Sequence, residues 1–145
     1  MARFWAQLFT PVFLVVTVLG VIVTMADKGY GGTPGGNLGD LSLHVTWTRN
    51  ILDAVCLAVC VWVGFVAPRR AGRLATILLG AALLALGIAG FLIGDDDAAT
   101  KGFAAMHFPP AVNVFDLVAG LLGLLSGLGT VEDADTPARQ TARSG

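Results

Sequence analysis

Four stretches of the chain are apolar enough to form membrane-spanning helices, and two of them are clearly long enough. The first, Phe4 to Ala26, has no charged residue and a single amide, Gln7, and the stretch from Leu74 to Gly94 also has no charged residue. Because the hydrocarbon core of a bilayer is about 30 Å thick, a helix needs roughly 20 apolar residues to cross it. Both stretches meet that length.

Two shorter apolar runs cover residues 54–68 and 117–131, with 15 residues in each. At about 1.5 Å of rise per residue, a helix of that length spans only about 22 Å. Each helix becomes long enough if it begins one turn earlier, and the added turns contain polar residues. The pattern therefore predicts spans near 5–25, 49–66, 74–94 and 112–130.

The predicted fold class is all-α, an integral membrane four-helix bundle. The membrane domain covers residues 1–131, and a polar cytoplasmic tail covers 132–145. An alternating strand pattern is absent from the sequence. An alternative interpretation treats the first run as a cleaved signal peptide, because residues 24–26 (TMA) resemble a cleavage site. The length of that run, and the three spans that would lose their partner, favour a retained helix.

The composition agrees with a membrane protein. Of the 145 residues, 55% are hydrophobic and 13% are charged, and the mean hydropathy is +0.76. Soluble domains usually carry about 25% charged residues, so an ordinary water-soluble fold is excluded. The net charge of -1 excludes a basic surface for nucleic acid. Two cysteines and two histidines are too few for a disulfide framework or a zinc ribbon, and no cofactor is expected.

Lysine and arginine are unequally divided between the two sides of the predicted bundle. Cytoplasmic loops of membrane proteins carry the excess of these residues. We therefore expect a multi-pass protein of the cell inner membrane with both termini, and the turn at 67–73, in the cytoplasm. The cations of that side are Arg3, Arg69, Arg70, Arg73, Arg139 and Arg143, and those of the other side are Lys28, Arg49 and Lys101.

The chain contains an internal repeat. The segments LHVTWTRNILD at 43–53 and MHFPPAVNVFD at 106–116 share His, five residues, Asn, two residues and Asp, at a constant offset of 63. Each copy closes one helix pair, so the bundle is predicted to consist of two parallel helix-hairpin repeats about an axis along the membrane normal. Two polar sets then lie at the outer face: His44, Asn50 and Asp53 in one, and His107, Asn113 and Asp116 in the other.

The Asn-x-x-Asp spacing has two interpretations. As structure, it is a helix start, because Asn is a good N-cap and an acid in the first turn reaches back to the cap and meets the positive end of the helix dipole. The second interpretation is a functional site, because an acid inside a membrane is costly to keep and is retained mainly where it has a function. Imidazole and carboxylate groups suit a divalent metal such as zinc, and histidine also suits a proton relay. The helix-start interpretation does not account for the repeated histidines.

The two aspartates differ in their helical neighbours. Asp53 has Arg49 four residues before it, whereas Asp116 has only Val112 and Gly120 at the same spacing. A carboxylate alone in a low-dielectric region binds a proton or finds a partner. We therefore predict that Asp116 contacts outer-face water or one of Arg49, His44 and His107.

The four-span plan, the duplication and the start of the last helix resemble a known family. The start of that helix reads Asn113-Val-Phe-Asp116, followed by Gly120-Leu-Leu-Gly123. These features are similar to small bacterial, mostly actinobacterial, membrane proteins grouped as domain of unknown function 4383. The resemblance covers roughly residues 5–130 and implies a four-helix membrane topology without an activity. Members usually carry a histidine within the helices after these asparagines, where this chain has Asp53.

Small residues predict close helix packing, because they let helix backbones approach each other in a membrane. The packing is either internal to the bundle or a contact between subunits. Two GxxxG pairs are formed by Gly90 with Gly94 and by Gly123 with Gly127, and an alanine stripe extends the first through Ala81, Ala85 and Ala89.

Tryptophan and cysteine have simpler interpretations. Trp5, Trp47 and Trp62 lie near predicted span ends and are expected to be anchors at the lipid interface. Cys56 and Cys60 are four residues apart on one helix, where a disulfide is geometrically poor. We expect both to be free and buried.

Catalysis has little support in the sequence. None of Ser42, Ser126 and Ser144 has a histidine nearby in a nucleophile–base arrangement, and there is no HExxH or phosphate-binding loop. We expect a non-enzymatic structural or accessory component of the bacterial inner membrane. Its expected partners are membrane lipid and either copies of itself or a membrane complex. The alternative is a minimal transport, ion-binding or pH-sensing module that uses the outer-face His-Asn-Asp sets.

Overall fold

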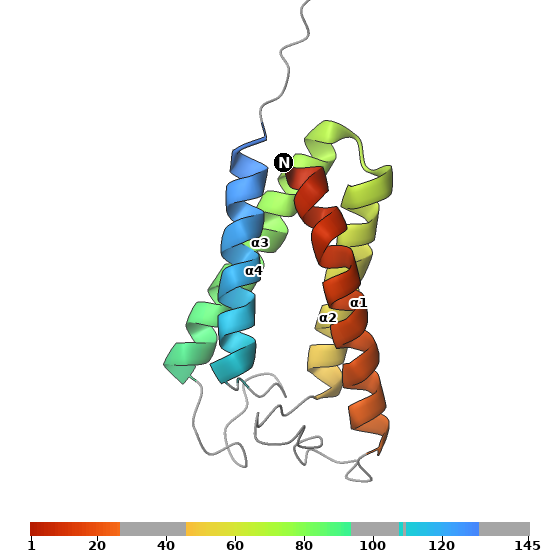
Figure 1. Cartoon of the computed structure of the whole chain (residues 1–145). Coiled ribbons are helices and arrows are strands. Elements are labelled where there is room, and N and C mark those ends of the chain that lie inside the picture. The colour runs from red at the N-terminus through yellow and green to blue at the C-terminus, as the bar shows by residue number, and fades with distance from the viewer. Residues whose placement is uncertain (27–45, 94–107, 109, 131–145) are drawn as a thin grey trace, which may run out of the picture.

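The computed structural model describes residues 1–26, 46–93, 108 and 110–130, and these form an all-α bundle (Figure 1). The predicted fold class is confirmed in this respect. The second helix continues without a break into a π-helical turn, η2. The elements are α1 (Ala2–Ala26), α2 (Trp47–Val61), η2 (Trp62–Val66), α3 (Arg69–Ile93) and α4 (Pro110–Leu128).

All four predicted spans are present as helices, with α2 and η2 together forming one of them. Each is long and apolar enough to cross a membrane by length and composition. The largest difference is at α3, which begins at Arg69 rather than near residue 74. Its arginines therefore lie in the helix and not in a turn. Arginine is a good helix former, and its long side chain carries the charge away from apolar surroundings, so the charge limits the apolar span but not the helix.

The helices are arranged as two hairpins. Figure 1 shows α1 beside α2 and α3 beside α4, and contacts are denser within these pairs than between them. At one end of the bundle, the backbone N–H of Ala2 donates to Thr130 Oγ1 over 2.8 Å and Arg3 Nη2 donates to the Ala67 carbonyl over 3.0 Å. We call this the N-terminal end. The opposite end, where α2 and α4 begin, is called the cluster end.

The α3–α4 hairpin is held by direct backbone approach. A methyl group at Gly80 would lie 2.8 Å from the Gly120 carbonyl oxygen, and one at Gly87 would lie 2.9 Å from the Asn113 carbonyl oxygen. Such distances are shorter than van der Waals contact, so only glycine fits. Dispersion between backbones this close is a main source of helix association in a membrane, where water does not drive it.

The predicted small-residue surface is thus partly right. Gly90, Gly123 and Gly127 are buried, whereas Gly94 lies outside the described residues. The alanine stripe does not pack inside the bundle, because Ala81 and Ala85 are exposed, and a contact between subunits through it stays a prediction. The buried face of α3 is instead the row Gly72, Thr76, Gly80, Leu83, Gly87 and Gly90. Glycines allow a closer approach than alanines, so they determine which face of α3 meets α4.

A column of aromatic rings on α1 fills the centre of the bundle. Trp5 stacks on Phe9 with ring centroids 4.8 Å apart, and Phe13 meets Phe115 of α4 edge-to-face at 5.7 Å. Trp5 is only 3% exposed, so the expectation that it anchors the protein at the lipid interface is wrong. The small residue Gly123 opens space for its ring. Trp47 and Trp62, in contrast, are about 40% exposed.

The π-helical turn is joined to α1 by a hydrogen bond from Gln7. The wider turn is closed by a bond from the Ala67 N–H to the Trp62 carbonyl over 2.7 Å. Gln7 Nε2 donates to the Gly64 carbonyl over 3.0 Å. The single amide in the first apolar run thus donates to a backbone carbonyl of η2. In a bilayer core, which contains no water, such a carbonyl needs a partner within the protein.

The glycine interface can be tested with two matched substitutions on α3. We expect Gly80→Ala to lower the free energy of unfolding by about 2 kcal/mol, because its methyl group overlaps backbone atoms of α4. Gly72→Ala is the control, since a methyl group there meets Ala67 and Val63 at an ordinary 3.6 Å. It should be neutral or stabilising, because alanine favours a helix. Denaturant unfolding in detergent measures both, and equal losses would contradict the interface.

Candidate functional site

Arg49 is the centre of a buried ionic cluster at the cluster end of the bundle. It lies in the first turn of α2, where its backbone N–H donates to the side chain of Thr46, the N-cap, over 3.3 Å. Its guanidinium group makes two hydrogen bonds to Asp116 of α4, from Nη1 to Oδ2 over 2.6 Å and from Nη2 to Oδ1 over 2.7 Å. Parallel bonds of this kind are among the strongest polar contacts in proteins.

Asp53 is the second carboxylate on the same guanidinium. Arg49 Nε lies 3.2 Å from Asp53 Oδ1, but its N–H is aligned with Oδ2, at 3.4 Å. Asp53 Oδ1 therefore has a charge contact and accepts no hydrogen bond from the described residues. The contact with Asp53 is longer and less well aligned than the contact with Asp116, so Asp116 is the principal partner of Arg49.

The cluster is almost completely buried. Asp116 is 0% exposed, Asp53 is 2% exposed and Arg49 is 5% exposed. With one guanidinium and two carboxylates, the cluster carries one negative charge more than positive charge when both acids are ionised. Removing charges from water is costly, and burial strengthens the attraction between those that are paired. Arg49 therefore contacts both acids, but its single positive charge cannot compensate both of them.

The predicted contact of Asp116 with Arg49 is confirmed, and so is the intrahelical pair of Arg49 with Asp53. The two aspartates of the repeated motif thus converge on one cation. His44 and His107 lie outside the described residues. Within the described part of the chain, no group of three or more His, Cys, Asp or Glu is placed to hold a metal ion.

The asparagines are not helix caps, and the helix-start interpretation is wrong for both. Thr46 caps α2, and Asn50 lies one turn inside the helix. For α4, Pro110 is the first helical residue, a position that suits proline because it needs no N–H partner. Asn113 therefore also lies within its helix. A cap must accept from backbone N–H groups, whereas both asparagine side chains donate elsewhere.

Each asparagine makes a buried contact outside its own helix. Asn50 Nδ2 donates to Thr24 Oγ1 of α1 over 2.9 Å, and Asn113 Nδ2 donates to the Phe108 carbonyl over 3.0 Å. Asn113 also packs against Gly90 of α3, where no side chain would fit. The Oδ1 atoms of Asn50 and Asn113, like that of Asp53, accept no hydrogen bond from the described residues. Three buried acceptor oxygens thus share the cluster end.

The cysteines are free and buried, as predicted. They belong to the apolar core together with Phe13 and Leu83, on the face of α2 that also carries Asp53. They pack in the apolar core next to the ionic cluster and form no hydrogen bond with its described residues.

Arg49 is absent from the predicted His-Asn-Asp sets, although the sequence names it among the possible partners of Asp116. Its position inside a predicted span was the signal, since a charge there needs a partner. Thr24 and Phe108 gave no such signal. Their roles depend on which atoms of other segments lie beside them.

Comparison with known proteins gives no match among family models, curated proteins or solved structures. The resemblance to domain of unknown function 4383 accordingly stays a prediction.

Neutralising the two carboxylates separately tests the hierarchy within the cluster. We expect Asp116→Asn to lower the free energy of unfolding by about 2 to 3 kcal/mol, because the buried guanidinium loses its two-point partner. Asp53→Asn should cost less than about 1 kcal/mol, since the Arg49–Asp116 pair remains and the excess negative charge is removed. Thermal or denaturant unfolding in detergent gives both values. Equal losses, or a larger loss for Asp53→Asn, would contradict the assignment of Asp116 as principal partner.

Proposed function

We propose that this chain is a non-catalytic integral membrane protein, a structural or accessory component of the bacterial inner membrane. In this proposal the buried Arg49–Asp116 pair fixes the two helix hairpins relative to each other. The observation that supports this proposal most directly is the ion pair between α2 and α4, which has two parallel hydrogen bonds. The backbones of these two helices make few close approaches, so the long Arg49 side chain spans the space between them.

The distribution of polar contacts supports a structural role. Asn50 joins α2 to α1, Asn113 is seated against α3, and Gln7 joins α1 to η2. These side chains serve as links between helices in the apolar part of the molecule. An accessory protein of this kind acts through its lipid-facing surfaces, on other membrane proteins or on a second copy of itself.

The orientation is part of the proposal. The start of α1, the connection at 67–68 and Thr130 share one end of the molecule, and Arg3, Arg69, Arg70 and Arg73 belong to this end. The described carboxylates, Asp53 and Asp116, belong to the other end. The excess of arginine favours the cytoplasmic side for the N-terminal end.

A second candidate is a proton- or cation-responsive module, favoured by the composition of the ionic cluster. The groups that face Asp53 are Arg49 and Cys56 on α2 and Asp116 on α4. With two acids and one base, the cluster is neutral only when it also holds a proton or a cation. The Oδ1 atoms of Asn50, Asp53 and Asn113, which accept no hydrogen bond from the described residues, add acceptors of the type that hard cations prefer.

The structural proposal is tested by the distance between the hairpins. Spin labels at Ile51→Cys and Val114→Cys, two exposed positions on α2 and α4, report this distance in a chain whose own cysteines are replaced by alanine. We expect a narrow distance distribution by pulsed electron paramagnetic resonance for the otherwise unaltered protein and for Asp53→Asn. Asp116→Asn should broaden it, because the link between α2 and α4 is lost. An unchanged distribution in Asp116→Asn would overturn the proposal.

Proton flux distinguishes the two candidates. The protein is reconstituted in vesicles that enclose a pH-sensitive dye, and a pH gradient is imposed with valinomycin and potassium to cancel the membrane potential. As an accessory component, the protein should pass protons no faster than protein-free vesicles. A flux that is present in the unaltered chain and abolished by Asp53→Asn would instead establish the second candidate. Gly72→Ala, which lies outside the cluster, controls for altered reconstitution.

A further inference from the structure

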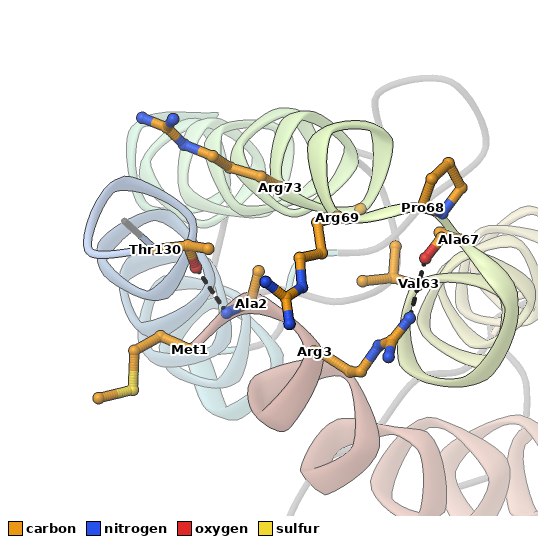
Figure 2. Close-up of a pocket in the computed structure, with 10 residues that line it drawn as sticks. Met1, Ala2, Arg3, Val63, Ala67, Pro68, Arg69, Arg73 and Thr130 are labelled. Atoms are coloured by element: carbon orange, nitrogen blue, oxygen red, sulfur yellow. Dashed lines mark hydrogen bonds between the residues drawn. The ribbon is translucent and has the colours of Figure 1, made fainter. Parts of the chain in front are cut away.

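The N-terminal end of the bundle contains a cavity of about 340 Å³ (Figure 2). Its wall is built from the start of α1, the end of η2 with the start of α3, and the end of α4. Hydrogen bonds from Ala2 to Thr130 and from Arg3 to Ala67 join these segments around it. The cavity is thus a product of the fold, formed where three segments distant in sequence meet.

The chemistry of the cavity wall is cationic. Arg3, Arg69 and Arg73 line it, and none of the described residues of its lining is acidic. Figure 2 shows the guanidinium group of Arg69 beside Ala2 and that of Arg3 directed toward the Ala67 carbonyl. Arg3 uses one N–H on the Ala67 carbonyl, and a guanidinium group has five. This bond holds Arg3 in place without using all its donors.

Two helix starts add to the positive potential. Both α1 and α3 begin at this cavity, and the first turn of a helix presents N–H groups with no partner in the helix and the positive end of its dipole. Arginine is the less favourable charge at such an end, whereas an anion is the favourable one. An anion in the cavity would therefore be attracted by the side chains and by both backbones.

The position of the cavity determines which anion is available. It lies at the ends of helices that are each long enough to cross a bilayer, which is the level of the lipid headgroups. Arginine binds phosphate through two parallel hydrogen bonds, and basic pockets between helix ends are known sites for lipid phosphates. We propose that this cavity binds the phosphate of an anionic phospholipid headgroup, with Arg3 and Arg69 as its principal ligands.

Lipid binding is tested with the full chain in detergent, freed of bound lipid. Phosphatidylglycerol should raise the unfolding temperature and remain bound in native mass spectrometry, whereas phosphatidylcholine and inorganic phosphate should have much weaker effects. We expect Arg3→Gln and Arg69→Gln each to weaken the apparent affinity for phosphatidylglycerol by about tenfold, the loss of one charge-assisted contact. If inorganic phosphate raises the unfolding temperature and phosphatidylglycerol raises it no further, the cavity binds free phosphate, and the proposal of a lipid ligand is overturned.

Arg70→Gln is the matched control, because it removes the same charge from the next residue and Arg70 does not line the cavity. An equal loss of affinity in this variant would show general charge attraction and overturn the site. Three acids, Glu132, Asp133 and Asp135, follow Thr130 in sequence. If phosphatidylglycerol protects the chain only after these three are neutralised, the chain's own acids hold the cavity, and the proposal is overturned.

Discussion

A buried guanidinium group between two carboxylates is the constraint on which the arrangement of this bundle depends. In an apolar medium, charged and polar groups must be satisfied within the protein. Arg49 can meet Asp116 only if α2 begins at Thr46, which places Arg49 in the first turn. It also requires α4 to begin at Pro110, so that Asp116 lies almost two turns inside its helix. The pair therefore sets the register and rotation of α2 against α4.

The two hairpins that this pair connects are stabilised in different ways. In α3–α4, glycines bring the backbones into direct contact, and the large side chains of the partner helix fill the remaining space. In α1–α2, aromatic rings from α1 and the cysteines of α2 supply the volume. The first kind of packing tolerates almost no change in size where backbone meets backbone, as at Gly80 and Gly120. The second can adjust through side-chain rotation.

The two ends of the molecule have opposite chemistry. The cluster end places its described carboxylates inside the bundle, where a single arginine contacts both. At the N-terminal end the arginines are half-buried or exposed around a cavity. Charges inside the bundle act on the packing of helices, whereas charges at a membrane surface act on lipid and on orientation. One residue type thus occurs in two settings, and its depth in the bundle distinguishes them.

The sequence by itself determined the number of helices, their approximate ends and the Arg49–Asp53 pair, because bilayer thickness and the helical repeat are local constraints. It also placed Asp116 among residues that require a partner. Tertiary structure alone decided that this partner is Arg49, 67 residues away in the chain. It also turned Ala81 and Ala85 outward and buried Trp5, against expectation. A face or a partner is chosen by the neighbouring helix, and hydropathy along one helix carries no information about the shape of the next.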